Sequence, residues 1–273
     1  MKHVLLIVSI LAFAHPSFAQ EGWESGGWVG VANYFGDLNT NFDLSEPGFA
    51  AGVLFRYNFN DRIALKFAGN FGQISADDAN SDNIFERARN LSFRSNIFDG
   101  SAQIEFNFLP YIHGSRDQFF TPYLSAGPVV FNFEPEAELN GEFVELRPLG
   151  TEGQFKGEEY FSTQLGLAYG GGIKVAFSYL WSLDFHIDAR WLFTDYLDDV
   201  STIYADPDDI ANIRNETAAI LSNRAIDLPG VETDFAPGTQ RGNQFNNDTY
   251  VFIGLGLVYY FGDLRCPNVS RKN

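Results

Sequence analysis

The sequence predicts an all-β fold: an eight-stranded antiparallel transmembrane β-barrel of the outer-membrane type, with long extracellular loops. Three observations predict it. The last strand-like stretch, Thr249 to Phe261, is long enough to cross a bilayer core. Aromatic residues make up 16% of the chain and charged residues only 19%, which fits a lipid-facing wall better than a water-facing surface. The connections between the predicted strands alternate between short and long, as the turns and loops of outer-membrane barrels do.

The chain begins with a predicted secretory signal peptide, residues 1–19. A basic start is followed by an apolar run from Val4 to Ala14 and by small residues that end at Ala19. The apolar run is too short for a transmembrane helix. We therefore expect cleavage between Ala19 and Gln20 and export of the remaining chain.

The first three strands follow in quick succession. A glycine-rich strand is predicted from Trp23 to Tyr34, and a second from Gly48 to Phe59, where apolar residues alternate with Leu54, Arg56 and Asn58. Asn60-Asp61 favours a tight turn. The third strand, Arg62 to Gly72, places Lys66 opposite its apolar face.

The next two strands frame the middle of the chain. The fourth is predicted from Leu91 to Leu109, and its apolar face changes parity near Ile97-Phe98. This change indicates either a bulge or a strand that rises beyond the membrane. The link from Pro110 to Gln118 leads to a fifth strand, Phe119 to Phe131, which a long acidic loop from Asn132 to Glu159 follows.

The last three strands include the clearest alternation. The sixth, Tyr160 to Phe177, is interrupted by three glycines, and Ser178 to Leu180 forms a turn into the seventh, Trp181 to Phe193. Strict period two in the seventh strand is typical of a sheet with two different faces. Trp181 and Trp191 lie ten residues apart, a separation of about 25 Å after tilting, which matches the two aromatic girdles of a barrel.

The largest loop, Thr194 to Asp248, precedes the final strand. Within it Asp206 to Ile226 is predicted to be helical, with Asp206 as the N-cap and Pro207 in the first turn. The final strand has one face of aliphatic and aromatic residues and another that includes Gly254 and Gly256. At roughly 3.3 Å per residue and a tilt near 45°, it spans about 30 Å.

A closed barrel follows because an open strand edge in lipid leaves several kcal/mol of unmade hydrogen bonds per group. Residues 20–262 are predicted to form the barrel in the outer membrane, with loop 194–248 on the extracellular side. An even strand count returns the C-terminus to the periplasm, so residues 263–273 form a predicted periplasmic tail. Cys266 is the single cysteine, which excludes an internal disulfide.

Charged residues on the inward faces are the candidate functional group of the barrel. Eight strands leave an interior just wide enough to be filled by side chains. Two interpretations remain open: a buried ion network that packs the interior, or an ion-conducting path. The residues concerned are Arg56, Lys66, Asp99, Glu105, Asp184, Asp188 and Arg190.

Composition and motifs argue against several other functions. The net charge is near −18 after signal removal (17 Lys+Arg, since Lys2 is lost from 18, against 35 Asp+Glu), which disfavours nucleic acid as a partner. His113 and His186 are the histidines of the exported chain, and neither lies near a predicted nucleophile, so no catalytic residue is expected. No cofactor or metal site is expected because no His or Cys pair has ligand spacing.

Two acidic runs leave one alternative open. Glu134, Glu136 and Glu138 form the first run, and Asp206, Asp208 and Asp209 form the second. Such runs could attract divalent cations at the lipid surface. Most charge runs are simply solvated.

Two end motifs carry a family resemblance. Tyr34-Phe35-Gly36-Asp37-Leu38-Asn39 ends the first strand, and Tyr259-Tyr260-Phe261-Gly262-Asp263-Leu264-Arg265-Cys266-Pro267 ends the last. With the signal peptide and the eight-strand layout, they resemble the PorG-type outer-membrane barrels of the type IX secretion system. The resemblance in layout covers the whole exported chain, and the specific motifs cover its two ends.

The resemblance implies a non-enzymatic subunit in the outer membrane of a Gram-negative envelope. Such a subunit would sit among outer-membrane lipids and anchor a periplasmic ring of PorK- and PorN-type proteins. Its tail residues Asp263, Leu264, Arg265 and Cys266 are the expected contacts with that ring, and Cys266 could form an intermolecular bridge. The alternative is a barrel without secretion duties, either a structural envelope protein or a surface adhesin that uses the outer loops.

Overall fold

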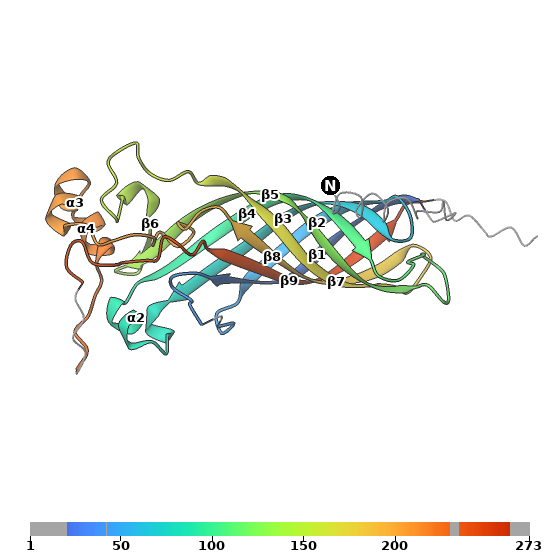
Figure 1. Ribbon diagram of the computed structural model, residues 1–273, viewed down its shortest axis with the longest axis horizontal. Helices are drawn as coiled ribbons and strands as arrows, with labels where there is room; N and C mark the ends of the chain where they lie inside the picture. The colour runs from blue at the N-terminus through green and yellow to red at the C-terminus, as the bar shows by residue number, and fades with distance from the viewer. Residues whose placement is uncertain (1–20, 42, 230–234, 263–273) are drawn as a thin grey trace, which may run out of the picture.

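The computed structural model describes residues 21–41, 43–229 and 235–262 and shows a closed antiparallel barrel (Figure 1). Eight strands form the wall, and a short ninth strand, β6, pairs with one of them near one end of the barrel. The strands are β1 (Gly22–Phe35), β2 (Gly48–Asn58), β3 (Ile63–Asp77), β4 (Ser92–Asn107), β5 (Phe120–Leu139), β6 (Glu142–Glu145), β7 (Thr163–Ala176), β8 (Trp181–Leu192) and β9 (Thr249–Tyr260). The predicted fold class is confirmed.

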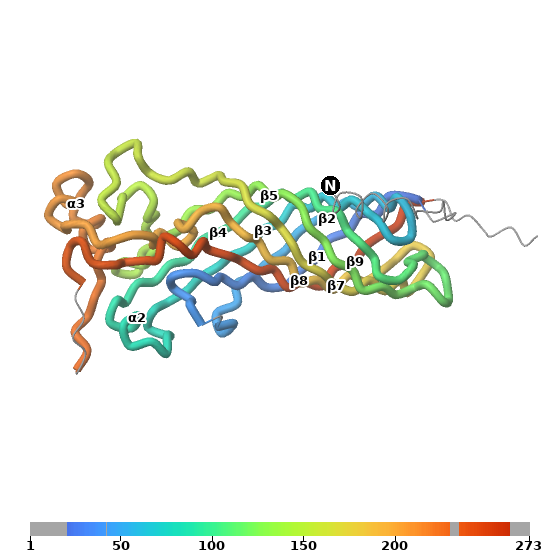
Figure 2. The backbone as a smooth tube through the Cα atoms, in the orientation of Figure 1, coloured from blue at the N-terminus to red at the C-terminus, as the bar shows by residue number. Residues whose placement is uncertain are grey.

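Closure comes from pairing between the first and last strands. Each wall strand pairs with its neighbours in sequence, and β1 also pairs with β9 over a long register that includes Gly27 opposite Leu257. β5 pairs with β7 from Phe120 to Asn132 and with β6 near its end. The strands wind obliquely around one long axis, as the tube in Figure 2 shows. No wall strand is left with an unpaired edge along its full length.

The two faces of the wall differ as the alternation predicts. Large apolar side chains point outward and are about half exposed, among them Phe55 (56%), Ile104 (65%) and Leu165 (63%). Inward positions of the same strands carry buried polar groups such as Arg56 and Glu105. Trp181 and Trp191 both lie on the outward face of β8. No helix within the described residues is long and apolar enough to span a membrane.

The two ends of the barrel are built differently. Short connections at residues 59–62, 108–119 and 177–180 lie at one end, on the right in Figure 1. The described parts of connections 36–47, 78–91, 140–162 and 193–248 lie at the other end. We call these longer connections, with the strand ends that carry them, the cap.

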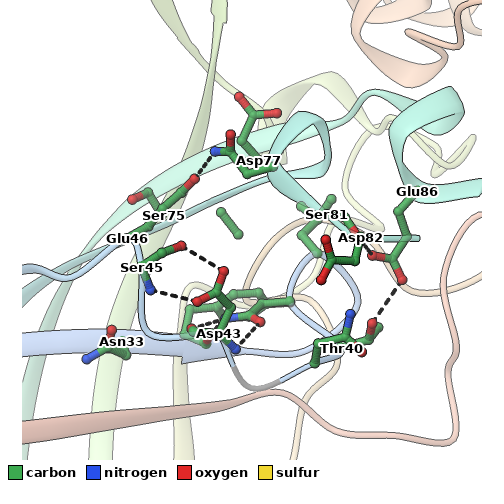
Figure 3. A pocket seen from close by; sticks show the side chains of 16 residues that line it. Asn33, Thr40, Asp43, Ser45, Glu46, Ser75, Asp77, Ser81, Asp82 and Glu86 are labelled. Atoms are coloured by element: carbon green, nitrogen blue, oxygen red, sulfur yellow. Dashed lines mark hydrogen bonds between the residues drawn. The ribbon is translucent and has the colours of Figure 1, made fainter. Parts of the chain in front are cut away.

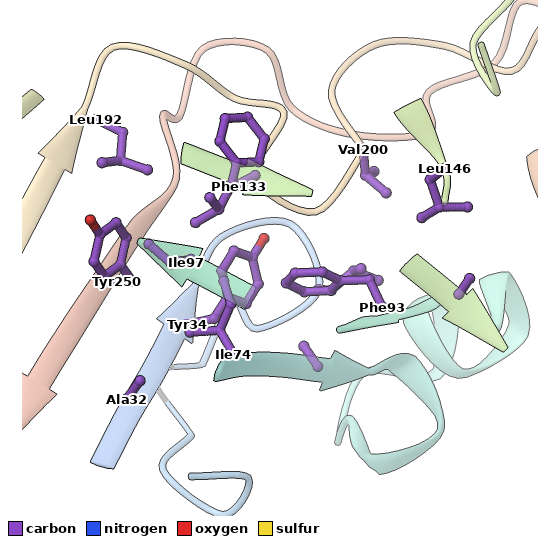
Figure 4. Packing of buried hydrophobic residues seen from close by; sticks show 14 of the residues in the cluster. Ala32, Tyr34, Ile74, Phe93, Ile97, Phe133, Leu146, Leu192, Val200 and Tyr250 are labelled. Atoms are coloured by element: carbon purple, nitrogen blue, oxygen red, sulfur yellow. The ribbon is translucent and has the colours of Figure 1, made fainter. Parts of the chain in front are cut away.

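The cap is folded around its own apolar core. At the cap end of the barrel, inward side chains of several strands pack against residues of the long connections, as Figure 4 shows. Tyr34 and Phe93 make an edge-to-face contact with ring centroids 4.8 Å apart, and Phe133 stacks on Tyr160 at 5.9 Å. Other members of the cluster are Ile74, Ile97, Leu146, Leu192, Val200, Ile210 and Leu221. The long connections are therefore a packed layer that covers the barrel.

The cap also explains the change of parity in β4. The ladder between β3 and β4 is continuous from Ile63↔Phe106 to Asp77↔Ser92, so no bulge is present. Odd-numbered residues point inward throughout β4. From Asp99 toward the short-turn end they are polar and fill the barrel, whereas Phe93 and Ile97, on the cap side of Asp99, belong to the apolar cap core. The side chains on the inward face change in character, and the strand itself stays regular.

Two sequence predictions need correction. β5 runs to Leu139 and turns through β6, so the acidic loop predicted from Asn132 to Glu159 is partly sheet. Glu134, Glu136 and Glu138 concealed this extension because they occupy its outward positions, where the rest of the wall carries apolar side chains, while Phe133 and Ala137 face inward and are buried.

The helix predicted from Asp206 to Ile226 is two short helices, α3 (Pro207–Ile213) and α4 (Glu216–Ser222). Asp206 caps α3 as predicted, with its side chain accepting from the Asp208 amide. Asn215 breaks the run because its side chain caps the second helix through the Ala218 amide. The connection before β4 also contains a short helix, α2 (Ile84–Arg89), and two 3-10 turns, η1 (Asp78–Asn80) and η2 (Arg147–Leu149), lie in the cap.

One of the short connections carries a buried histidine. His113 lies in the link predicted from Pro110 to Gln118, and it is 3% exposed and packs into the barrel end. The predicted signal peptide, residues 1–19, and the predicted tail, residues 263–273, lie outside the described residues.

Candidate functional site

The interior of the barrel holds a continuous chain of ion pairs. Toward the short-turn end, Arg56 contacts three carboxylates. Its Nη1 atom lies 2.7 Å from Glu24, and its Nη2 atom lies 2.5 Å from Asp184 and 3.1 Å from Glu105. Lys174 adds a second cation to Glu105 at 2.5 Å. All five side chains are almost completely buried. Each carboxylate therefore finds its charge partner within the wall.

The chain continues toward the cap. Lys66 Nζ lies 3.6 Å from Glu105 and 3.3 Å from Asp188, and so links the lower group to the upper one. Arg190 Nε contacts Asp99 at 2.9 Å, and its guanidinium lies 4.4 Å from the centre of the Phe252 ring. Five buried acids (Glu24, Asp99, Glu105, Asp184 and Asp188) thus face four buried bases (Arg56, Lys66, Lys174 and Arg190). Buried charges are tolerated only when paired in this way.

Aromatic residues and glycines fill the remaining interior. The Trp28 indole donates to Asn70 at 3.0 Å and lies edge-on to His186 at 4.8 Å. A Cβ atom at Gly254 would lie 2.5 Å from the Trp28 ring, so the glycine leaves the room that the indole needs. The cavity left between Trp28, Tyr123 and Arg190 measures about 10 Å³. That is about the room of one water molecule.

The short-turn end is closed by three rings. His113 stacks on Tyr260 with centroids 4.7 Å apart and meets Tyr111 edge-on at 5.1 Å. Its Nε2 atom lies 3.1 Å from Glu24, the lowest member of the ion chain. The Tyr260 hydroxyl donates to the backbone oxygen of Glu21 at 3.0 Å. Residues of the link and of β9 therefore close the barrel below the charges.

Sequence reasoning named seven of the interior charges and missed two. The structure brings Arg56, Lys66, Asp99, Glu105, Asp184, Asp188 and Arg190 together in one network. Glu24 and Lys174 were missed because glycines dilute the alternation of β1 and β7. Counting by twos from Trp28 would have placed Glu24 inside, and counting from Ala168 would have placed Lys174 there.

The first of the two end motifs is a joint between strand and cap. The Tyr34 hydroxyl lies 2.5 Å from Asp198 and 3.1 Å from Asp248. The Asp37 carboxylate accepts from the Asn243 amide at 2.8 Å. Asn39 donates to the Tyr34 backbone oxygen at 2.8 Å. The motif thus ties β1 to the longest connection of the cap.

Two ion pairs hold the cap together. Arg89 pairs with Asp78 through two bonds of 2.8 Å and also donates to the backbone oxygens of Asp37 and Arg241. Arg241 pairs with Glu152 at 3.0 Å. Burial nonetheless raises the pKa of several cap carboxyls: that of Asp37 lies at about 6 and that of Asp195 at about 8.

A groove of about 360 Å³ opens on the side of the cap (Figure 3). It lies between the segment after β1 and the η1–α2 region, and Asp43, Asp77 and Asp82 are among the carboxylates that line it. The lining includes no Lys, Arg or His. Glu86 accepts from Thr40 at 2.9 Å and from Ser81 at 2.5 Å, which ties the two walls of the groove together.

No metal site accompanies these carboxylates. Within the described ranges, no group of three or more His, Cys, Asp and Glu side chains is placed to hold a metal ion. His186 is enclosed by the barrel wall, and His113 serves in the closure of the short-turn end. The predicted contact residues Asp263, Leu264, Arg265 and Cys266 lie outside the described residues.

The ion network generates a stability prediction. Replacing Arg190 by Ala leaves Asp99 buried without its cation and should lower the free energy of unfolding by about 3–5 kcal/mol. Arg94→Ala is the matched control, because its pair with Glu136 is 37% and 27% exposed and should contribute at most about 1 kcal/mol. Urea unfolding in detergent micelles measures both. Equal effects of the two substitutions would refute the pairing of Arg190 with a buried charge.

Solved structures with similar folds were found at low sequence identity. Neisserial surface protein A (NspA) is 12% identical with a TM-score of 0.42, and the match covers 88% of this chain and 97% of that one. OprG from Pseudomonas aeruginosa is 13% identical with a TM-score of 0.40, covering 90% and 97%. Ail from Yersinia pestis is 11% identical with a TM-score of 0.39, covering 89% and 99%.

Sequence comparisons give a more specific result. No curated protein matches the chain. Residues 2–215 match the family described as "Domain of unknown function (DUF6089)". The match spans well over half of the chain and includes every wall strand except β9. The chain therefore belongs to the DUF6089 family.

Proposed function

We propose that this protein is a non-enzymatic barrel of the outer membrane that serves as an anchoring subunit of the type IX secretion machinery. The observation that carries the proposal is the filled interior. Buried ion pairs occupy the barrel, and the cavity beside Trp28, Tyr123 and Arg190 measures about 10 Å³. A barrel of this kind transports nothing through its centre, so its function belongs to its surfaces.

The outer wall supports placement in a lipid bilayer. Its side chains are apolar and half exposed around the whole barrel, including Val53, Phe106 and Leu255. Burying such a surface in lipid removes it from water, and the closed ladder leaves no strand edge in the hydrocarbon. Outer-membrane lipids are thus the first partner of this chain.

The two ends support different roles for the two sides of the membrane. Outer-membrane barrels place short turns in the periplasm and long loops outside. The turns at 59–62, 108–119 and 177–180 and the tail beyond Gly262 would then face a periplasmic ring of PorK- and PorN-type proteins. The resemblance of the two end motifs to PorG-type barrels supports that choice of partner.

A second function, surface attachment, is favoured by the groove of the cap. Asp43 and Asp82 are exposed there beside hydroxyl and amide groups, and no basic side chain is among the described residues that line the groove. A surface of this composition suits a cationic ligand. Binding of such a ligand to whole cells, lost in the combined variant Asp43→Asn and Asp82→Asn, would favour the adhesin alternative.

The proposed orientation predicts where proteases cut intact cells. Phe245 of the cap is 86% exposed and Tyr179 of a short turn is 60% exposed, so both offer chymotrypsin sites. In intact cells chymotrypsin should cut after Phe245 and not after Tyr179, whereas in permeabilised cells it should cut at both sites. Mass spectrometry of the fragments measures the cuts. Cleavage at Tyr179 with Phe245 spared in intact cells would reverse the orientation.

The secretion role predicts the phenotype of a deletion. Cells without this protein should retain secretion cargo in the periplasm while the bulk membrane stays intact. Complementation with the full chain should restore export, which immunoblots of medium and periplasm measure. Normal export in the deletion strain would leave only the envelope and adhesin alternatives.

A truncated chain tests the contact with the ring. Truncation after Gly262 should leave a folded barrel but abolish co-purification of the ring proteins after gentle detergent extraction. Co-purification at the wild-type yield would instead point to the three short turns.

A further inference from the structure

We infer that the cap is a proton-linked element, in which protons shared among buried carboxyl groups hold segment 194–202 against the end of the barrel. The segment follows β8 and lies across the apolar core of the cap, with Leu197 and Val200 buried in it. As these protons are lost at rising pH, the segment should separate more often from the layer beneath it.

The first observation is a count of protons around one hydroxyl group. The Tyr34 hydroxyl lies 2.5 Å from Asp198 Oδ2 and 3.1 Å from Asp248 Oδ1, and all three side chains are at most 1% exposed. A phenol has a single proton to donate. The second contact can be a hydrogen bond only if one of the two carboxyl groups carries a proton and donates it to the phenol oxygen.

The second observation is an unpaired carboxyl group in the same segment. Asp195 is 7% exposed, and both of its side-chain oxygens are buried, with no hydrogen bond of good geometry to either. The neighbouring Ser201 hydroxyl favours the ionised carboxylate, but burial outweighs it. The neutral acid is therefore the favoured form.

The basic groups of the cap do not compensate these acids. Arg89 is engaged by Asp78, and Arg241 is engaged by Glu152. Glu152 in turn accepts from the Ser201 and Thr202 amides, at 2.8 and 3.0 Å.

The charged and titratable groups around the segment come from every neighbouring element. They are Tyr34 of β1, Asp37 after it, Arg89 of α2, Glu152 and Tyr160 before β7, Tyr196 and Asp199 within the segment, and Tyr204, Arg241 and Asp248 before β9. Acids outnumber bases in this set, so deprotonation adds uncompensated charge to a buried layer.

The same carboxyl groups hold the backbone of the segment. Asp248 accepts from the Leu197 amide at 2.8 Å, and Asp198 accepts from the Val200 amide at 2.9 Å. Burial and the neighbouring acids raise the pKa of Asp198 and Asp248 well above the usual range, and burial raises that of Asp195 to about 8. An acid whose folded pKa is raised stabilises the closed cap below its ordinary pKa. That contribution is lost as the pH rises from about 4 to about 8.

Hydrogen exchange tests the inference on the full exported chain in detergent micelles. The protection factors of the Leu197 and Val200 amides, corrected for the intrinsic rate at each pH, should fall more than tenfold between pH 5 and pH 8. The reason is linkage, which changes an opening equilibrium up to tenfold per pH unit for each proton released. Amides in the middle of β8 should keep constant protection and serve as the internal reference.

Two variants distinguish the titration of the buried Asp195 from a general effect of the acidic residues in the cap. Asp195→Asn removes the titration while it keeps the shape, so protection at pH 8 should exceed that of the wild type at least tenfold. Asp209→Asn changes an exposed acid of α3 in the same cap and should leave the wild-type profile unchanged. Constant protection of the wild type from pH 5 to pH 8 would overturn the inference without any variant. So would identical profiles for the wild type and Asp195→Asn.

Discussion

The pairing of every charge inside a closed wall is the constraint on which the rest of this structure depends. Arg56 alone contacts Glu24, Glu105 and Asp184, which come from β1, β4 and β8. Arg56 itself lies on β2, which pairs along the ladder with β1 but not with β4 or β8, so two of its three ion pairs join parts of the wall that share no backbone ladder. An unpaired member would leave a buried charge, which is strongly unfavourable. Closure of the sheet therefore depends on the filling of its interior, because the strands that close the barrel also supply the partners of its buried charges.

The barrel contains two cores of opposite character. Below Asp99 the interior is polar and ionic, and above it the inward side chains are apolar and merge with the cap. This division explains the length of β4 and β5, because strands that serve both cores must rise beyond the polar section. It also gives the motif at Tyr34 a structural role, since the tyrosine lies where the two cores meet and joins β1 to the segments above it.

The sequence was sufficient for the wall and insufficient for the cap. Period two with aromatic outward faces placed every wall strand, because lipid-facing and inward residues differ strongly in such strands. It also placed the inward charges wherever the alternation was complete, as in β8 with Asp184, Asp188 and Arg190. Glycines concealed Glu24 and Lys174. The cap escaped prediction because its connections are polar and irregular, and their packing depends on contacts between residues far apart in the chain, such as Tyr34 with Asp198 and Arg89 with Arg241.

The central claim is that side chains fill the interior of this barrel and leave no path for ions. Electrical recording tests this claim most directly. The full exported chain is reconstituted into planar bilayers and recorded at several voltages beside the Arg56→Ala variant. The ion chain and the rings of His113 and Tyr260 should leave the wild type without stable conductance steps. Stable unitary steps in the wild type whose size changes in the Arg56→Ala variant would show that ions pass through the interior, and would contradict the account.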